Sequence, residues 1–351
     1  MPPRTKATLE DVARLAAVST ATVSRALSHP DLLQPETLER VRAAIAQLNY
    51  VPGGAARALA SGKTLTIGAV VPTLDHAIFA RAIQAMQTEL AAKGYQLLVA
   101  ASDYVPTLEA AAVRAMLARG VDALMVVGAD HLDETWSLLT TSSVPVVLSW
   151  SFDARLPSIG FDNRAAGRLL AEHLLGLGHR RFGMISGHLR ANDRARMRVE
   201  GVRAALAERG LELTPSQIIE TSFTLAGGRA GLVELMGRAQ PPTAVICGND
   251  LLAAGALLEA QASGLAVPEA LSIVGIDNLE IAAHLTPPLT TVHLPTTELG
   301  RAVAEHLLAR LKGEARPARL ELPIELVLRR SAAPPREAQA QDASRTQAAG
   351  G

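Results

Sequence analysis

The chain has 351 residues, of which 48% are hydrophobic and 19% charged, the composition of a globular protein with a large core. This length exceeds one small domain and predicts two or three. A single cysteine, Cys247, excludes an internal disulfide framework and a thiol-rich metal site. Because no apolar run is long enough to span a membrane, and residues 1–6 lead into no apolar signal segment, we expect a cytoplasmic protein.

The overall charge gives no indication of the partner. Lys and Arg total 34, as do Asp and Glu. Residues 1–63, however, carry eight basic and five acidic side chains. This local surplus of positive charge is small and does not by itself establish DNA binding.

The first fifty residues predict three short helices. Thr8 and Asp11 are spaced as a capping box ahead of apolar residues with a helical period. Ser19 is the expected N-cap of a second helix that ends near Leu27. Pro35 suits the first turn of a third helix.

From Leu65 onward, apolar strand segments alternate with amphipathic helical segments, a pattern typical of parallel sheets covered by helices on both faces. About 270 residues of this pattern predict two similar lobes. Residues from Pro334 have no apolar period and are expected to be disordered. The expected strands are 66–71, 96–100, 123–127, 144–148, 181–186, 243–247 and 271–276, and the clearest helices are 80–92, 108–119 and 165–175.

The first two predicted helices form a helix-turn-helix, the unit that presents its second helix to the DNA major groove. The second helix opens with Ser19-Thr20-Ala21-Thr22-Val23-Ser24-Arg25. Its short side chains allow close approach to DNA, and Arg25 can reach a guanine or a phosphate. Three-helix bundles of this kind also occur in proteins that bind no DNA, so periodicity alone leaves both interpretations open.

Particular strings in the sequence are more specific than its periodicity. Those in the first 52 residues are Leu9-Glu10-Asp11-Val12-Ala13, Val18-Ser19-Thr20-Ala21-Thr22-Val23-Ser24-Arg25-Ala26-Leu27 and Leu48-Asn49-Tyr50-Val51-Pro52. They resemble the DNA-binding headpiece of the LacI–GalR family of repressors. The resemblance covers about residues 8 to 331 and is carried further by Ile67-Gly68, Gly160-Phe161-Asp162-Asn163, Leu177-Gly178-His179-Arg180-Arg181, Gly248-Asn249-Asp250, Val274-Gly275-Ile276-Asp277 and Pro288-Leu289-Thr290-Thr291-Val292.

The resemblance implies an all-α helix-turn-helix headpiece joined to an α/β core of two doubly wound parallel sheets, similar to periplasmic binding proteins. It implies a homodimer that binds a palindromic operator in double-stranded DNA under the control of a small-molecule effector, with no cofactor and no metal. The expected parts are a headpiece (1–51), a hinge helix (52–64), a core (65–333) and a disordered tail (334–351). Within the core, lobe 1 is expected at about 65–162 and 293–323, and lobe 2 at about 163–292 and 324–333.

The resemblance also assigns residues to the DNA interface. Thr20, Ala21 and Arg25 match the base-reading positions. Leu59 matches a leucine that wedges between base pairs at the centre of the operator, although an ordinary packing leucine is the alternative. The expected DNA-binding residues are Thr8, Ser19, Thr20, Ala21, Thr22, Ser24, Arg25, Asn49, Tyr50, Arg57 and Leu59.

Three positions depart from the family pattern. Ala17 stands where the turn usually has glycine, and a positive φ there would cost about 1 kcal/mol. Gln34 replaces the small hydroxyl cap of the third helix. Gly53 replaces a typical asparagine, and the Gly53-Gly54 pair weakens the hinge helix by about 1 kcal/mol per glycine. We therefore expect a hinge that is disordered off DNA and folds on it, and the alternative is a lost polar contact to DNA at Gly53.

The effector site is expected in the cleft at the carboxyl ends of the strands. A guanidinium and Asx side chains suit a polyol, and an aromatic ring supplies an apolar wall. Alternative roles are core packing for Phe223, helix capping for Asn249-Asp250 and a surface ion pair for Arg198. The expected effector-binding residues, matched from the family, are Phe79, Asp162, Arg198, Phe223, Asn249 and Asp277.

The identity of the effector is predicted only as a sugar or sugar acid. Phe79-Ala80 and Gly160-Phe161-Asp162-Asn163 resemble the gluconate-operon repressors most, which favours a sugar acid. Four nearby arginines fit an anionic ligand, although such clusters are typical of solvated faces. They are Arg190, Arg194, Arg196 and Arg198.

Two other classes of function, an enzyme and a transport protein, are the alternatives to a regulator. No nucleotide-binding or phosphate-binding glycine motif, nucleophile elbow or metal-ligand spacing of histidines supports an enzyme, so no catalytic residue is expected. A sugar-binding transport protein would fit the core alone but not the headpiece. Whether the effector releases or promotes DNA binding, as an inducer or a corepressor, stays open.

Overall fold

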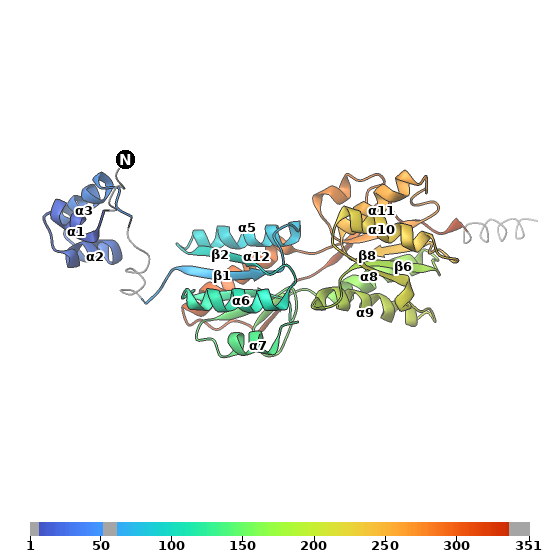
Figure 1. Ribbon diagram of the computed structural model, residues 1–351, viewed down its shortest axis with the longest axis horizontal. Helices are drawn as coiled ribbons and strands as arrows, with labels where there is room; N and C mark the ends of the chain where they lie inside the picture. The colour runs from blue at the N-terminus through green and yellow to red at the C-terminus, as the bar shows by residue number, and fades with distance from the viewer. Residues whose placement is uncertain (1–6, 52–61, 337–351) are drawn as a thin grey trace, which may run out of the picture. The chain divides into compact units, whose positions relative to one another are not determined.

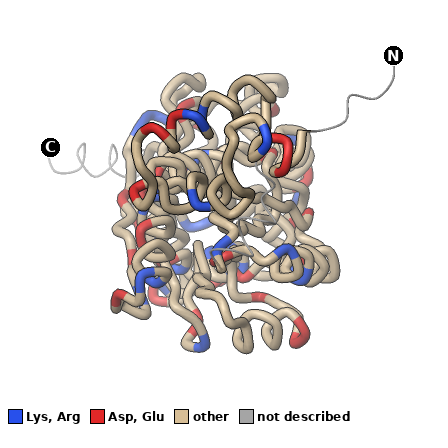
Figure 2. Tube along the Cα trace, turned by 90° about the vertical axis from the view of Figure 1, so that its left-hand side faces the viewer, with Lys and Arg blue, Asp and Glu red and all other residues tan. Residues whose placement is uncertain are grey.

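The computed structural model describes residues 7–51 and 62–336 (Figure 1). The predictions for Gly53, Arg57 and Leu59 therefore lie outside the described residues. The described residues form two compact units, one of residues 7–51 and 62–66 with 120–122 and the other of the remainder. Basic and acidic residues are intermingled along the trace (Figure 2). Within the described ranges, no helix combines the length and the apolar character needed to cross a membrane.

The headpiece contains the three predicted α-helices. Val12, Val23 and Val41 lie at the centre of its small core and are fully buried. The predicted caps at Thr8 and Ser19 are confirmed. The elements are α1 (Leu9–Leu15), α2 (Thr20–Ser28), the 3-10 helix η1 (Pro30–Leu32) and α3 (Pro35–Gln47).

Ala17 and Gln34, the two headpiece residues that depart from the family pattern, adopt the backbone and capping geometry expected for their side chains. Ala17, in the turn between α1 and α2, adopts the positive φ of 53° that the family's usual glycine would adopt more easily. Gln34 is the N-cap of α3 but makes no side-chain capping hydrogen bond. This helix therefore starts on Pro35, whose fixed φ is already helical.

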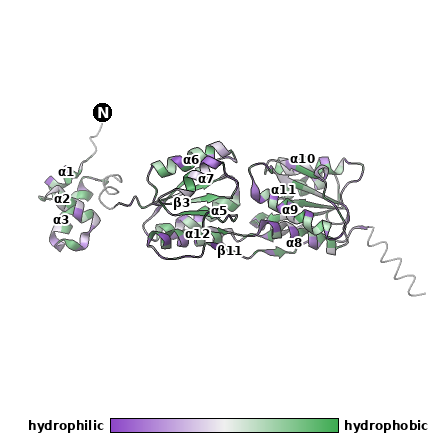
Figure 3. Ribbon diagram, turned by 90° about the horizontal axis from the view of Figure 1, so that it is seen from below, coloured by the Kyte–Doolittle hydropathy of each residue, from purple (hydrophilic) through white to green (hydrophobic). Residues whose placement is uncertain are grey.

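Lobe 1 is a parallel six-stranded sheet between two layers of helices (Figures 1 and 3). The strand order is β11-β5-β4-β3-β1-β2. Helices α5 and α12 pack together on one face, and α6 and α7 on the other. The strands are β1 (Thr66–Val71), β2 (Gln96–Ala101), β3 (Ala123–Val127), β4 (Val146–Ser149), β5 (Ser158–Gly160) and β11 (Arg319–Glu321), and the helices are α5 (Ala77–Ala91), α6 (Pro106–Ala118), α7 (Asp133–Thr140) and α12 (Thr296–Leu311).

Lobe 2 repeats this design with the strand order β12-β10-β9-β8-β6-β7, in which only the β10–β12 pair is antiparallel. Helices α8 and α9 pack together, as do α10 and α11. The strands are β6 (Phe182–Gly187), β7 (Ile218–Thr221), β8 (Ala244–Cys247), β9 (Ser272–Asp277), β10 (Thr290–His293) and β12 (Glu325–Val327), the α-helices are α8 (Asn163–Gly176), α9 (Asp193–Ala207), α10 (Leu225–Met236) and α11 (Asp250–Ala262), and the 3-10 helices are η2 (Pro215–Gln217) and η3 (Glu280–Ala283).

The chain passes between the two lobes three times: after β5, after β10 and between β11 and β12. The predicted fold class, a helix-turn-helix headpiece with a two-lobed α/β core, is confirmed. Because both sheets are mostly parallel, the carboxyl ends of their strands come together at one end of each lobe, where doubly wound proteins bind ligands.

Candidate functional site

Helix α2 presents a polar, short-chained surface suited to a DNA groove. Thr20, Ala21 and Arg25 are exposed, while Val23 and Ala26 anchor the helix in the headpiece core. This division leaves the predicted base-reading positions free to contact a partner.

The residues at the start of α2 are held by hydrogen bonds. The Thr22 backbone N–H donates to Ser19 Oγ at 3.1 Å, and the two hydroxyls lie 2.9 Å apart. Ser24 is half-buried. An N-terminus ordered in this way, with positive helix-dipole character, is suited to a phosphate.

The other expected DNA-binding residues of the headpiece lie at helix ends. Thr8 caps α1, its backbone and hydroxyl both donating to the Asp11 carboxylate. Asn49 is exposed with a φ of 46°, and Tyr50 packs partly against the headpiece core.

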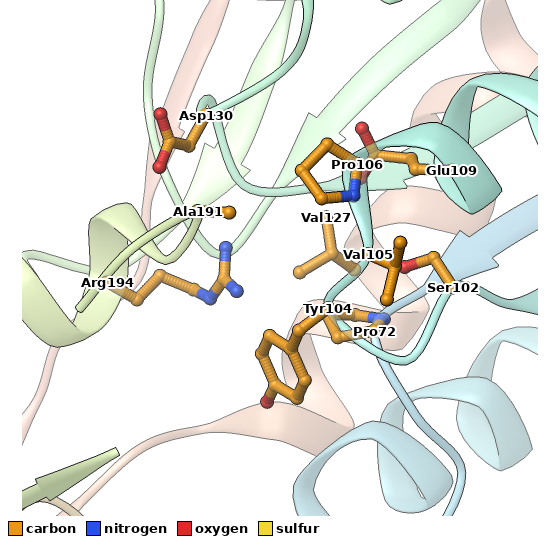
Figure 4. A pocket seen from close by; sticks show the side chains of 10 residues that line it. All are labelled: Pro72, Ser102, Tyr104, Val105, Pro106, Glu109, Val127, Asp130, Ala191 and Arg194. Carbon is orange, nitrogen blue, oxygen red and sulfur yellow. The ribbon is translucent and has the colours of Figure 1, made fainter. Parts of the chain in front are cut away.

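Among the described residues, two cavities that share several lining residues lie in the core, at the carboxyl ends of strands from both lobes. A further cavity of about 20 Å³ lies beside them, lined by Tyr104 and Arg194 among others (Figure 4). The inner cavity, of about 20 Å³, has room for one water molecule, and the outer cavity is about 270 Å³. They share His76, Tyr104, Asn192 and Phe223. The inner cavity is also lined by Ile78, Phe79, Trp150, Arg194, Ala195, Arg198, Asn249 and Asp277, and the outer one by Thr73, Asp75, Asp103, His188, Arg190, Ser222 and Thr224.

Arg198 is a buried residue of α9, only 5% exposed, and not a surface ion-pair former. Its Nε donates to Asn163 Oδ1 at 3.0 Å and its Nη1 to the Gly248 carbonyl at 2.6 Å. Burial lowers the pKa of this guanidinium, an effect that nearby Asp277 opposes. Arg198 is thus a fixed cation with its position set by neutral acceptors.

Asp277 ends β9 as a strained and buried carboxyl. It is 4% exposed, its φ is 122°, and within the described residues Oδ1 has no hydrogen-bond partner. Burial raises its pKa well above the usual value, and Asp250 raises it further, while Arg198 opposes both. A buried acceptor without a partner is suited to a ligand that donates a hydrogen bond.

Asp250 has a structural role beside the site. Its carboxylate accepts from the Leu279 N–H at 2.7 Å and from the Thr291 hydroxyl, joining the ends of β9 and β10. Burial raises the pKa of Asp250 to about 7. It does not line either cavity.

Aromatic rings form the apolar walls. Phe79 packs against Trp150 with ring centroids 5.0 Å apart. The His76 and Phe223 rings are 5.3 Å apart, which brings lobe 1 against lobe 2. Phe223 lies directly over Gly187, where a Cβ atom would collide with its ring. Phe223 lines both cavities and also packs against the hydrophobic core of lobe 2, the alternative role expected for it.

Two of the sequence-predicted residues also cap helices. Asn249 Oδ1 accepts from the Leu252 N–H at 2.9 Å at the start of α11, and the same residue lines the inner cavity. Asp162 Oδ1 accepts from the Ala165 N–H at 2.9 Å and caps α8. Asp162 lines neither cavity, so the structure brings together five of the six expected effector residues.

Sequence reasoning missed several residues of the site, including His76, Tyr104 and Trp150. Arg194 was named only as part of an arginine cluster, yet it is 7% exposed and pairs with Asp193 at 2.8 Å. Figure 4 shows Arg194 extending from lobe 2 toward Tyr104 of lobe 1.

Two contacts accommodate Arg194 and Asp193 against lobe 1. At Gly128, whose φ is 88°, a Cβ atom would collide with the Arg194 guanidinium. The Ala129 N–H donates to Asp193 Oδ2 at 3.1 Å.

The described part of the chain contains no group of three or more His, Cys, Asp or Glu residues arranged to hold a metal ion.

Comparisons with known proteins agree with this architecture. Residues 8–53 match the model of "Bacterial regulatory proteins, lacI family", and residues 171–332 match "Periplasmic binding protein-like domain". The chain is 35% identical to the ribose operon repressor of Haemophilus influenzae over 87% of this chain and 92% of that one. It is 33% identical to the HTH-type transcriptional repressor PurR of the same species over 93% and 98% of the two chains.

Solved structures show the same fold. A LacI-family regulator from Silicibacter pomeroyi is 29% identical with a TM-score of 0.86, covering 93% of this chain and 99% of that one. The lac repressor dimer, bound to operator and the anti-inducer ONPF, is also 29% identical, with a TM-score of 0.83 over 94% and 100% of the two chains. The chain belongs to the lacI family of bacterial regulatory proteins and is a DNA-binding repressor of that family.

Proposed function

We propose that this repressor acts in the cytoplasm as a homodimer on a palindromic operator and is controlled by a small sugar bound between the two lobes. The observation that carries this proposal is the inner cavity, where Arg198, Asp277 and Asn249 meet the rings of Phe79 and Phe223. Fixed polar groups between flat apolar walls are suited to a sugar, which has hydroxyl groups at its edges and apolar ring faces.

The charges around the inner cavity favour an uncharged sugar over a sugar acid. Arg194 is paired with Asp193, and Arg198 has Asp277 as its nearby acid. When both carboxyl groups are ionised, these two acids offset the two arginines among the described lining residues, which disfavours a carboxylate ligand. The similarity to a ribose operon repressor supports an aldose, while the sequence resemblance to gluconate-operon repressors supports the acid.

The volume of the inner cavity and its lining by both lobes explain how a bound sugar would change the affinity for the operator. At about 20 Å³ the inner cavity is smaller than any sugar, so binding requires the rings or lobes to move. A ligand shifts a conformational equilibrium only by binding one arrangement more tightly than another. Because both lobes contribute side chains, a bound sugar favours one lobe arrangement.

On the DNA side, we propose that the exposed residues Thr20, Ala21 and Arg25 read bases in the major groove. At the start of the same helix, Ser19, Thr22 and Ser24 would bind backbone phosphates or position neighbouring groups that bind them. For the hinge, we propose that Leu59 wedges into the minor groove at the centre of the operator and that Arg57 contacts DNA beside it.

The test uses the full chain and two measurements. Selection from random-sequence DNA should yield a palindrome, and gel shifts on that palindrome with and without D-ribose should show a changed affinity. An inducer weakens the complex and a corepressor strengthens it. A chain that binds ribose but selects no DNA would instead be a binding protein of the transport class.

A further inference from the structure

Trp150 directly follows β4 and forms part of the inner cavity. It is 1% exposed and contacts Phe79, with ring centroids 5.0 Å apart. In a doubly wound sheet this position, at the carboxyl end of a strand, faces the ligand site. A tryptophan here brings an apolar ring and a single polar atom, Nε1, to the site.

The backbone of Trp150 is held in an unusual conformation. Its φ is 65°, a left-handed value that is rare for a large side chain. Its carbonyl accepts from Asn163 Nδ2 at 2.9 Å, and Asn163 Oδ1 accepts from Arg198 Nε at 3.0 Å. Asn163 thus links the backbone of Trp150 to the side chain of Arg198. Strain maintained by such a network is typical of a functional position.

The indole nitrogen has no partner within the described residues, although it is fully buried. Leaving a buried N–H without an acceptor disfavours folding, and an indole N–H can only donate. Asp277, which lines the same cavity, lacks a hydrogen-bond donor, because its buried Oδ1 has no partner among the described residues. Both atoms belong to residues that line the inner cavity, so a ligand that enlarges this cavity on binding can satisfy one donor and one acceptor.

We propose that Trp150 is a specificity-determining residue of the effector site, its indole N–H donating to an oxygen of the sugar while Asp277 accepts from a hydroxyl. The inference rests on the proposed function and adds a selection rule to it. A sugar lacking the oxygen that faces Trp150 leaves the indole N–H unsatisfied and binds more weakly.

The first experiment observes this hydrogen bond without changing Trp150. The chain has two tryptophans, and Trp136 does not line the inner cavity. A Trp136→Phe chain labelled with 15N-tryptophan therefore gives one indole resonance, that of Trp150. On addition of D-ribose, this proton should shift downfield and exchange with solvent at least about tenfold more slowly.

The second experiment measures affinity by calorimetry. Trp150→Phe keeps an aromatic ring but removes the N–H, and should raise the Kd for D-ribose about tenfold. Trp136→Phe is the matched control and should leave the Kd unchanged. Trp136→Phe should also bind operator DNA as the unaltered chain does.

The outcomes separate this inference from the proposed function. Ribose binding with an unchanged indole resonance, or a Trp150→Phe Kd within twofold of that of the unaltered chain, overturns the role of Trp150 alone. No ribose binding by the unaltered chain overturns both the sugar effector and the role of Trp150. Selection of a palindromic operator tests the regulator function independently of either result.

Discussion

At the scale of single residues, Asp277 combines a function with a cost in stability. Burial and the nearby Asp250 raise its pKa despite the attraction of Arg198, so its ionisation disfavours folding. Asp277→Asn removes this charge and should stabilise the protein by about 0.5–2 kcal/mol at pH 7. The same change replaces one carboxylate oxygen by an NH2 group that can only donate, and removes the negative charge, so it should weaken effector binding on the order of 10-fold.

The stability that Asp277→Asn adds should increase as the pH rises. A carboxyl whose pKa is higher in the folded protein disfavours folding only when it is ionised. The advantage of Asp277→Asn should therefore be absent below the ordinary carboxyl pKa of about 4 and grow as the pH rises above it. Urea unfolding of both proteins from pH 3 to 7 measures it. A variant less stable at pH 7 would show that the attraction to Arg198 dominates.

Single residues were predictable where a family motif named them. Phe79, Arg198 and Asp277 were assigned in this way, and the structure brings them into one cavity. Trp150 and Arg194 were not assigned, because composition and spacing do not show that an indole N–H lacks a partner or that an arginine is buried. These properties arise only when the ends of distant strands meet.

At the scale of elements, His179 connects two strands of lobe 2 to the C-terminal segment. Its Nδ1 lies 2.9 Å from Thr243 Oγ1, and its Nε2 lies 3.0 Å from Ser272 Oγ and 2.9 Å from the Ala333 carbonyl. Burial lowers the pKa of this imidazole to about 4. The neutral ring therefore serves as a structural connector.

This connector predicts acid sensitivity. Between pH 6.5 and about 4 the unfolded chain binds a proton at His179 and the folded chain does not. The free energy of unfolding therefore decreases as the pH is lowered through this window. The loss should be about 3 kcal/mol. His179→Gln should be less stable at pH 7 but show a flatter dependence between pH 4 and 6.5. Parallel curves for the two proteins would contradict a depressed pKa.

Periodicity predicted the long central elements better than the short edge strands. The seven predicted strands all occur, within two residues of their predicted ends. Strands β5, β7, β10, β11 and β12 were missed, because three or four residues are too few to show a period, and β11 is exposed along its length. Strand β4 begins at Val146 and not at Val144, after Pro145. Proline has no N–H to donate to a sheet.

At the scale of the whole molecule, we predict a dimer and not a tetramer. Residues 334–351 contain no leucine and no heptad pattern, so this segment lacks the apolar seam of a coiled coil that could join dimers. Light scattering at micromolar concentration should give twice the 36.8 kDa of the chain. A stable particle of four chains would show that another surface joins the dimers.

The central claim is that a sugar held by Arg198 controls operator binding, and operator titrations of Arg198→Ala with and without D-ribose test it most directly. In the unaltered chain, ribose should change the operator affinity at least about tenfold. Arg198→Ala should bind operator normally but show no response, because the loss of a buried charged donor removes about 2–4 kcal/mol of sugar binding. An Arg198→Ala chain that responds to ribose as the unaltered chain does would contradict the account.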